Sequence, residues 1–559
     1  MAELSSVEGI KAQSRQLRGT LAGELAAGGT HFATPSTQLL KFHGIYQQDD
    51  RDERKERNAA GAGPAYSFML RTKSPGGFVP AALFLALERL ADAHGSGTMR
   101  VTTRQGFQLH GVEKTELRET IRTIAETLGS TLGACGDINR NVMAPAAPFA
   151  APAYRVARET AHAIADLLTP QTGAYVEIWV DDERVATSEP EVEPIYGTTY
   201  LPRKFKVAVA APGDNSVDIF TNDIGVVPLL GDNGTPLGFD LYVGGGLGMT
   251  HRKPQTYPRL ASEFGFVAPD RLLSAVKAIV EVQRDYGDRT NRKHARLKYT
   301  IDDRGLDWFR AEVERQAGFA LEPFRSLPAW EFRDYLGWHE QGDGRLFLGL
   351  SVENGRVRDG DGAQLKSALR LIVERFGLDL VLTPNHNILL VGIPREERGA
   401  IDGILASAAV RPVEAIAPIE RFAMACPALP TCGQALTEAE RVLPSLVDRL
   451  EGRLRELGLQ DEPITLRMTG CPNGCARPYM GEIGIVGVSA DRYNLYLGGN
   501  LESTRLNRLH RELVPFAELG PAIDDVLVAF RRERRDGERF GDYCRRTAEA
   551  SPAIATAGD

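Results

Sequence analysis

The sequence predicts an α+β protein built as a duplicated module. The stretch Met99–Gly111 aligns with Leu380–Gly392 without a gap. Around the first stretch, hydrophobic spacing predicts the order strand–helix–strand–strand–helix, which is typical of a ferredoxin-like unit. A repeat with so long a period indicates two equivalent domains rather than a solenoid. We therefore expect two ferredoxin-like half-domains and two larger α+β domains around a pseudo-twofold axis.

Each element of the two copies follows from spacing and from turn residues. Leu83, Leu87 and Leu90 recur on one helical face, and Gly129 ends the second helix of the first copy. The first copy is predicted to hold strands at 66–72, 99–103 and 107–111 and helices at 80–94 and 115–128. The second copy is predicted to hold a strand at 346–352 and a helix at 364–376, before the stretch that aligns with Met99–Gly111.

The stretches after each copy also correspond, because Leu-Tyr-Val-Gly-Gly begins at Leu241 and Leu-Tyr-Leu-Gly-Gly begins at Leu495. Residues before the first copy are polar and poorly periodic, and the charged run Gln47–Arg57 favours a solvated arm or exposed helix over a docking surface. The predicted domains are an N-terminal arm (1–64), the first ferredoxin-like repeat (65–135), a first larger domain (136–335), the second repeat (336–415), and a second larger domain with a C-terminal tail (416–559).

Composition and charge limit the partners and the cellular location that we expect for this protein. The chain has 559 residues and a formal net charge of −8, which does not favour binding to nucleic acid or anionic lipid. It contains no apolar stretch of about 18 residues, and its start, Met-Ala-Glu-Leu-Ser-Ser-Val-Glu, lacks the features of a signal peptide. We expect a cytoplasmic protein with neither nucleic acid nor membrane as a partner.

Four of the six cysteines lie in two loops, spaced C-x5-C and C-x3-C. Zinc sites usually use C-x2-C or C-x4-C pairs with tight turns, whereas the intervals here are five and three residues. Proline and glycine in these loops leave backbone N–H groups free to point at sulfur, which favours an iron–sulfur cluster over structural zinc or unligated core cysteines. Cys135 and Cys544 stand alone and are expected to be small buried residues. Cys135 lies five residues before Arg140, so a role at the edge of the site stays open for it. The loop cysteines are Cys426, Cys432, Cys471 and Cys475.

These loops resemble the sirohaem–iron–sulfur signature of assimilatory sulfite and nitrite reductases, and are most similar to the haemoprotein (beta) subunit of sulfite reductase. The resemblance covers nearly the whole chain. Its motifs begin at Tyr46 (Tyr-Gln-Gln-Asp-Asp-Arg-Asp-Glu-Arg), Thr103 (Thr-Arg-Gln-Gly-Phe-Gln-Leu-His-Gly), Leu201 (Leu-Pro-Arg-Lys-Phe-Lys), Cys426, Thr469 and Tyr493 (Tyr-Asn-Leu-Tyr-Leu-Gly-Gly-Asn).

The resemblance implies two cofactors, a [4Fe-4S] cluster on the four loop cysteines and a sirohaem whose axial ligand is the thiolate of Cys475. It also implies cations, because burying the sirohaem carboxylates and a sulfite dianion without compensation is costly. Around the substrate these are Arg71, Arg140, Lys204 and Lys206. At the sirohaem carboxylates they are Arg100, Arg104, Arg203, Arg296 and Lys298. Arginine holds oxyanions through paired donors, and the two lysines are the expected proton donors.

Spacing supports part of this cation set independently. Lys204 and Lys206 are two residues apart, so on a strand they face one side, and the apolar run after them predicts that this strand is half-buried. Arg71 follows the apolar run Phe68-Met-Leu directly. In the repeat, Arg100 becomes Val381 and Arg104 becomes Asn385, so the second copy is expected to be the half without cofactor contacts.

The sequence leaves the roles of two histidines undecided. His386 stands where the resembling proteins commonly have Gln, and His110 is expected either at the sirohaem edge or as a satisfied core histidine. The glycine-rich stretch Val243–Gly248 lacks the third glycine of a dinucleotide fingerprint. With no flavin or nicotinamide module in the sequence, electrons are expected from a partner protein, an NADPH-dependent flavoprotein or a ferredoxin.

Two features favour sulfite over nitrite as the substrate. The first cysteine loop carries Pro427-Ala-Leu-Pro430, as the resembling sulfite enzymes do, and Lys206 occupies a position where nitrite enzymes often have a neutral amide. An extra cation suits a dianion better than a monoanion. The resemblance implies six-electron reduction of sulfite to hydrogen sulfide; the alternatives are a ferredoxin–nitrite reductase and a non-enzymatic iron–sulfur electron carrier.

Overall fold

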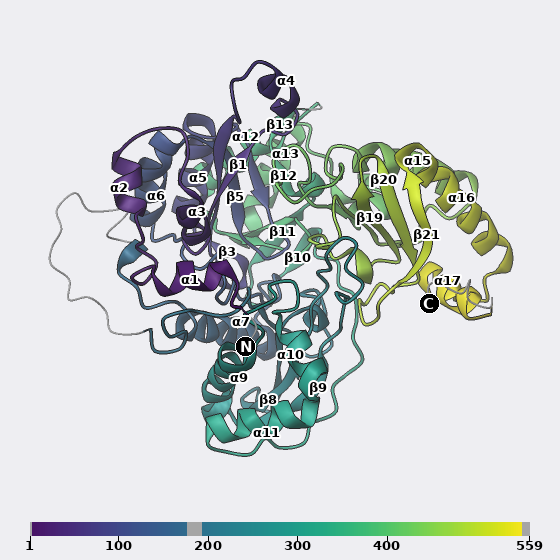
Figure 1. Ribbon diagram of the computed structural model, residues 1–559. Helices are drawn as coiled ribbons and strands as arrows, with labels where there is room; N and C mark the ends of the chain where they lie inside the picture. Colours follow the sequence, from purple (N-terminus) through teal and green to yellow (C-terminus); the bar gives the residue numbers. More distant parts are fainter. Residues whose placement is uncertain (1–2, 176–192, 361, 551–559) are drawn as a thin grey trace. The chain divides into compact units, whose positions relative to one another are not determined.

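The computed structural model describes residues 3–175, 193–360 and 362–550 (Figure 1). Residues 551–559 of the predicted C-terminal tail lie outside this range. Contacts divide the chain into two units. The first unit holds residues up to 246 together with 259–411, and the second holds 247–258 together with the residues from 412 onward.

The first ferredoxin-like copy forms a five-stranded sheet whose strands are β1 (Ile45–Asp49), β2 (Tyr66–Arg71), β5 (Phe107–Val112), β4 (Met99–Val101) and β12 (Arg356–Val357), in this order. Helices α5 (Ala81–Ala93) and α6 (Leu117–Glu126) pack together on this copy. The predicted leucine stripe of α5 is buried. Hydrophobic spacing therefore placed the strands and helices of this copy to within a few residues.

The second copy repeats this arrangement with β10 (Gly337–Glu340), β11 (Leu346–Leu350), β16 (Ile388–Ile393), β15 (Leu380–Leu382) and β3 (Phe78–Val79). Its helices are α12 (Leu365–Phe376) and α13 (Arg398–Ser407), and a two-stranded ribbon, β13 (Asp359–Gly360) with β14 (Ala363–Gln364), precedes α12. The gapless alignment holds in three dimensions, because the turn residues Gln105 and His386 both have positive φ, 54° and 70°.

Each copy contributes a two-residue strand to the sheet of the other copy. β3 follows β2 in sequence but pairs with β15 of the second copy. In return, β12 follows β11 but pairs with β4 of the first copy. A glycine with positive φ opens each exchanged strand, Gly77 at 84° and Gly355 at 78°. Each of the two sheets is therefore completed by a strand from the other copy.

Replacing Gly355 by alanine should destabilise the protein. An added Cβ would lie 2.5 Å from the carbonyl oxygen of Val101, in a left-handed backbone. Strain and overpacking of this kind together cost about 2–5 kcal/mol, so the unfolding temperature should fall clearly in a thermal melt. Gly377→Ala is the matched control, because its φ is also positive at 64° but nothing lies within 4 Å of the new Cβ. Equal shifts for both variants would contradict the packing argument.

The larger domain of the first unit contains the sheet β6 (Val207–Val209), β7 (Ile224–Leu230), β8 (Pro236–Val243) and β9 (Ser262–Val267). Its helices are α7 (Pro152–Leu167), α9 (Leu272–Tyr286), α10 (Leu297–Arg304) and α11 (Leu306–Ala317). α7 packs on β6 and β7, and α9 packs between α7 and α11. β6 pairs in parallel with β7, whereas β7, β8 and β9 pair antiparallel.

The second unit has the same sheet pattern in β17 (Ala423–Ala425), β18 (Leu466–Thr469), β19 (Ile483–Ser489), β20 (Arg492–Leu497) and β21 (Arg508–Pro515). Its helices are α14 (Pro418–Arg421), α15 (Leu443–Glu456), α16 (Phe516–Glu533) and α17 (Phe540–Ala550). Figure 1 shows α15 and α16 beside this sheet. The buried acids Asp223 and Glu482 directly precede β7 and β19, and each accepts a backbone N–H from the residue that precedes the paired strand, Lys206 before β6 and Thr465 before β18. The larger domains are therefore duplicated as well.

Residues before β2 do not stand apart as an arm. They form α1 (Ser6–Ala12), α2 (Leu21–Ala26), α3 (Thr34–Leu40) and the exposed helix α4 (Arg54–Ala59), besides the edge strand β1. Leu17, Leu21 and Leu40 are fully buried in the core of the first unit. Their apolar side chains are too scattered for a periodic signal, which is why the sequence suggested an arm. No helix in the described residues is long and apolar enough to cross a membrane.

Candidate active site

A row of basic side chains crosses one face of the first ferredoxin-like sheet. The register places Arg71 opposite Gln108, Gln108 opposite Arg100, and Arg100 opposite Arg356. Directly paired residues share a face of a sheet, so these side chains form one line across four strands. Like charges directly opposite each other are destabilising. Arg100 and Arg356 form such a directly opposed pair, and Gln108 separates Arg100 from Arg71, so this face favours an anion near the three arginines.

His110 lies two residues from Gln108 on the same strand, and hence on this face. Its ring is buried, and neither ring nitrogen has a hydrogen-bond partner among the described residues. Burial, and then the positive charges of Arg356, Arg100 and Arg71, hold the pKa of His110 well below its usual range. A buried polar ring without partners is unusual. This favours a role at the edge of a bound group over that of a satisfied core histidine.

The equivalent face of the second copy is apolar. Val381 and Leu389 stand at the positions of Arg100 and Gln108, and both are buried. They pack with Phe347, Tyr154 and Tyr335 in one hydrophobic cluster. The substitutions seen in the repeat thus fill this face with side chains, which agrees with the expectation that the second copy lacks cofactor contacts.

The remaining predicted substrate cations lie on two backbone segments that run in parallel. Asn139 is bridged to Phe205, and the N–H of Arg140 donates to the Phe205 carbonyl at 2.8 Å. Phe205 is buried, whereas Lys204 and Lys206 on either side of it are half-buried. This alternation is consistent with the two lysines sharing a face, although they lie just before β6, and β6 itself is fully buried rather than half-buried as the sequence predicted. Burial, then Arg296 and Arg104, hold the pKa of Lys206 well below its usual range.

Tyr46 and Cys135 join Arg140 to Arg71. A guanidinium N–H of Arg71 donates to the Cys135 Sγ at 3.0 Å, and one of Arg140 donates to the Tyr46 hydroxyl at 3.4 Å. The Arg71 guanidinium also lies 6.0 Å from the Tyr46 ring centre. Burial, and then neighbouring Cys135, raise the pKa of Tyr46 to about 12. Tyr46 was not predicted as a site residue, although it opens one of the quoted motifs.

Three of the cations predicted at sirohaem carboxylates are bonded to protein acceptors. Arg104 donates to the Asn222 side chain and to the carbonyls of Asn141 and Val207 at 2.6–3.0 Å. Arg296 forms a two-pronged ion pair with Asp223, at 3.1 and 2.7 Å. Lys298 donates to the Gly246 carbonyl at 3.0 Å, and burial lowers its pKa to about 7. Arg203 lies 3.8 Å from Asp137 and is half-buried.

Arg356 is a cation that the sequence interpretation missed. The exchanged strand β12 brings it from the second copy to the first sheet, beside buried Arg100. The repeat held a usable signal, because Gly355-Arg356 corresponds to Gly77-Phe78. The strand exchange places Arg356 on the first sheet, and no pattern in the sequence predicts that exchange.

The two cysteine loops follow neighbouring parallel strands of the second unit. Ala425 at the end of β17 lies opposite Met468 of β18, and the N–H of Cys426 donates to the Met468 carbonyl at 3.1 Å. Because parallel strands end at the same edge of a sheet, the loops start side by side. The N–H of Gly470 points at the Cys426 Sγ at 3.4 Å, and the amide of Asn473 points at the Cys475 Sγ at 3.0 Å.

The four thiols are close enough to interact. Burial, then Cys475, Cys432 and Cys471, hold the pKa of Cys426 well above its usual range. Thiolates crowded in this way need a cationic centre to stabilise them. Within the described ranges, no three His, Cys, Asp or Glu side chains are set to hold one metal ion. A four-iron cluster makes a different demand, with each thiolate binding its own iron.

Two family models match the chain. The model described as the nitrite and sulphite reductase 4Fe-4S domain matches residues 159–321 and 420–550. The model of the nitrite/sulfite reductase ferredoxin-like half domain matches residues 62–127 and 339–408. The chain belongs to the nitrite and sulfite reductase family. Both models match twice, which confirms the duplication of both kinds of domain in this reductase.

Full-length relatives agree with this assignment. The family member named sulfite reductase [ferredoxin] from Synechococcus elongatus is 50% identical, over 97% of this chain and 89% of its own. The sulfite reductase [NADPH] hemoprotein beta-component of Myxococcus xanthus is 48% identical, over 99% of this chain and 98% of its own. The solved structure of the Mycobacterium tuberculosis NirA protein superposes with a TM-score of 0.78 at 25% identity, covering 97% of this chain and 96% of NirA. The predicted α+β fold class is therefore confirmed.

Proposed function

We propose that this reductase is an assimilatory sulfite reductase, which reduces sulfite to hydrogen sulfide by six electrons at a sirohaem joined to a [4Fe-4S] cluster. The observation that carries the proposal is the identity of 46–50% to relatives named sulfite reductases over nearly the whole chain. The cation row and the four-cysteine set supply the side chains that these two cofactors require. A non-enzymatic electron carrier would leave the cation row without an anion to bind.

The chain's own residues would bind and protonate the substrate. Arg71 and Arg140 would hold sulfite oxygens through paired N–H donors. Lys204 and Lys206 would add positive charge and donate protons, and the lowered pKa of Lys206 makes it a readier donor than an ordinary lysine. When bound, the cluster and the sirohaem would pass on electrons from the donor protein and would supply the iron centre for the reduction.

We propose Cys426, Cys432, Cys471 and Cys475 as the cluster ligands, with Cys475 as the thiolate shared with the sirohaem iron. Asn473 donates to this sulfur, as outer partners of metal ligands commonly do. For the sirohaem carboxylates we propose Arg100 and Arg203 as direct contacts. Arg104, Arg296 and Lys298 are proposed as further contacts of these carboxylates, and their bonds to protein acceptors hold the three side chains in place. We also propose that the cofactor-binding domains span residues 136–335 and 416–559, as the sequence predicted.

Steady-state turnover with reduced methyl viologen tests the substrate, because this dye replaces the natural electron donor. The kcat/KM for sulfite should exceed that for nitrite, with slow nitrite reduction as a side activity. The physical reason is the density of cations, which binds a dianion more strongly than a monoanion. A higher kcat/KM for nitrite would favour the nitrite reductase alternative.

The electron donor is proposed to be a separate protein, either a ferredoxin or an NADPH-dependent flavoprotein. Relatives named for each donor are similarly identical to this chain, at 50% and 48%. Sulfite turnover with reduced ferredoxin, compared with turnover by NADPH and a flavoprotein subunit, separates the two. A cytoplasmic location completes the proposal and follows from assimilation of sulfide inside the cell.

A further inference from the structure

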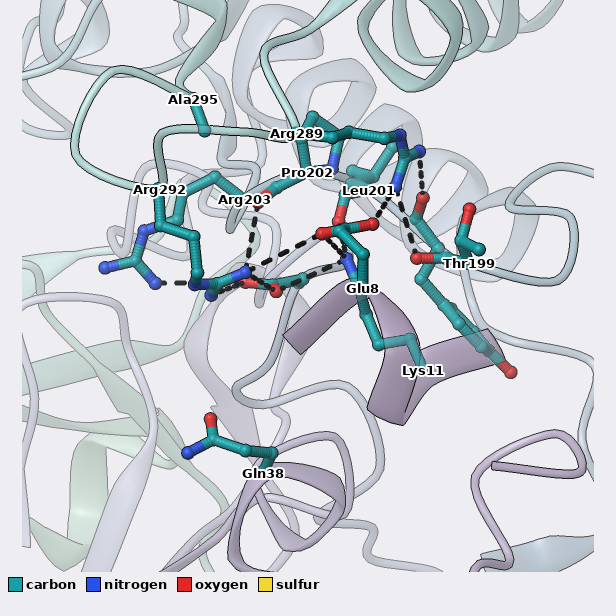
Figure 2. Close-up of polar contacts among 12 residues, drawn as sticks. Glu8, Lys11, Gln38, Thr199, Leu201, Pro202, Arg203, Arg289, Arg292 and Ala295 are labelled. Atoms are coloured by element: carbon teal, nitrogen blue, oxygen red, sulfur yellow. Dashed lines mark hydrogen bonds and ion pairs between the residues drawn. The ribbon is translucent and has the colours of Figure 1, made fainter. Parts of the chain in front are cut away.

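Lys11 of helix α1 is an ammonium group buried in the first unit. Its side chain has no exposed surface, and its Nζ lies 2.6 Å from Glu8 and 3.7 Å from Asp137. The same Nζ donates to the carbonyl of Leu201 at 2.8 Å (Figure 2). A buried lysine is found almost only where partners compensate its charge. Here the partners come from α1 itself and from two distant loops.

Two arginines extend the contacts of α1 to these loops. Arg289 pairs with Glu8 and donates to the carbonyls of Tyr200 and Arg284, at 2.7 and 2.8 Å. Arg292 holds both oxygens of Asp137, at 2.7 and 3.0 Å. In Figure 2, dashed lines join Glu8 to Lys11 and to Arg289. The first helix thus fastens Asp137 and residues 199–202 through one connected set of charges.

These two anchor points lie directly before the substrate cations. Asp137 precedes Arg140 by three residues, and Leu201 precedes Lys204 by three. The N–H of Leu201 donates to the Asp137 carbonyl at 2.9 Å, so the pairing that continues to Arg140 and Phe205 begins here. Tyr200 has a left-handed backbone, φ 54°. Such a conformation persists only where its surroundings hold it, and the bonds of Lys11 and Arg289 do this.

We propose that Lys11 and Glu8 are positioning residues for the sulfite site. They fix the distance between the segment that carries Arg140 and the segment that carries Lys204 and Lys206. This role rests on the proposed function, which makes those three cations the substrate contacts. Neither Lys11 nor Glu8 touches the substrate. Both act through the backbone that they hold.

The test compares Lys11→Met with Lys366→Met. Lys366 is the matched control, because it is also buried and ion-paired, with Asp92 and Glu88, but lies on α12. Misplacing a binding group by about 1 Å costs about 100-fold. In Lys11→Met the KM for sulfite should therefore rise about 10- to 100-fold, with a smaller change in kcat and with normal iron and sirohaem content. Lys366→Met should leave the KM unchanged.

Hydrogen exchange provides a readout that needs no turnover. Backbone amides of residues 137–143 and 199–207 should exchange faster in Lys11→Met than in the unsubstituted protein or in Lys366→Met. Glu8→Gln, a milder change, should show the same effects in smaller size and covers the case in which Lys11→Met does not fold. Unchanged exchange and an unchanged KM would overturn the positioning role. Faster exchange in a protein that does not reduce sulfite would instead refute the proposed function.

Discussion

Cys475→Ser should abolish sulfite reduction and deplete the protein of iron. Substitution of outer partners of a metal site typically costs 10–100-fold, so loss of a ligand should cost at least about 100-fold in activity. Cys475 is the exposed member of the four, whereas Cys426 and Cys471 are buried. Removing the Cys475 thiol therefore exposes the remaining three cysteines to solvent on the side where Cys475 lies. Iron and acid-labile sulfide per chain, measured beside the absorption spectrum, report the loss directly.

Cys544→Ser is the control for this experiment. Cys544 is buried on α17 and burial raises its pKa far above the usual value, which fits the predicted small core residue. It should keep full iron content and activity. A Cys475→Ser protein with normal iron, and with an unchanged electronic interaction between cluster and sirohaem, would show that another residue bridges the two cofactors.

Lys206→Gln should lower kcat/KM for sulfite by about 30-fold or more, because truncating one partner of a buried charge pair costs about 2–5 kcal/mol. The loss should be smaller for nitrite, which carries one negative charge. The pH profile provides a second signature. The pKa of Lys206 is lowered, so its proton is lost at a lower pH than for an ordinary lysine.

The sign of the pH effect follows from that loss. As pH rises through the lowered pKa, Lys206 becomes neutral and attracts the sulfite dianion less, so kcat/KM should fall on the alkaline side. In Lys206→Gln this fall should disappear, with kcat/KM low at every pH. Lys55→Gln on exposed α4 is the control and should keep the full profile. An unaltered alkaline limb in Lys206→Gln would assign the titration to another group.

Local sequence patterns indicated part of the site, and the family resemblance implied the roles of the remaining residues. The cysteine loops were recognisable because their spacing and their proline and glycine content are local features, and the two lysines could be paired because strand residues alternate. The repeat predicted both ferredoxin-like sheets. These inferences depend on residues that are close in sequence, where periodicity and turn chemistry act.

The rest depends on contacts between distant segments. Nothing in the sequence pairs Arg296 with Asp223, and that ion pair, which fixes the side chain of Arg296, is visible only in the folded chain. The burial of α1 is likewise decided by Arg289 and Asp137, more than a hundred residues away along the chain. Sequence patterns record which residues are charged, whereas only the folded chain decides which charges are already satisfied.

The crossing of β3 and β12 between the two sheets has a consequence for how this chain arose. A single ancestral copy would have completed its sheet only by lending that short strand to a second molecule of its own kind, in a domain-swapped homodimer. Fusion of two such genes would have raised the effective concentration of the lent strand to about the millimolar range. The two copies would then no longer have needed identical sequences in order to pair with each other. One copy could then carry arginines such as Arg71 and Arg100 on one face of its sheet, while the other closed the same face with Val381 and Leu389.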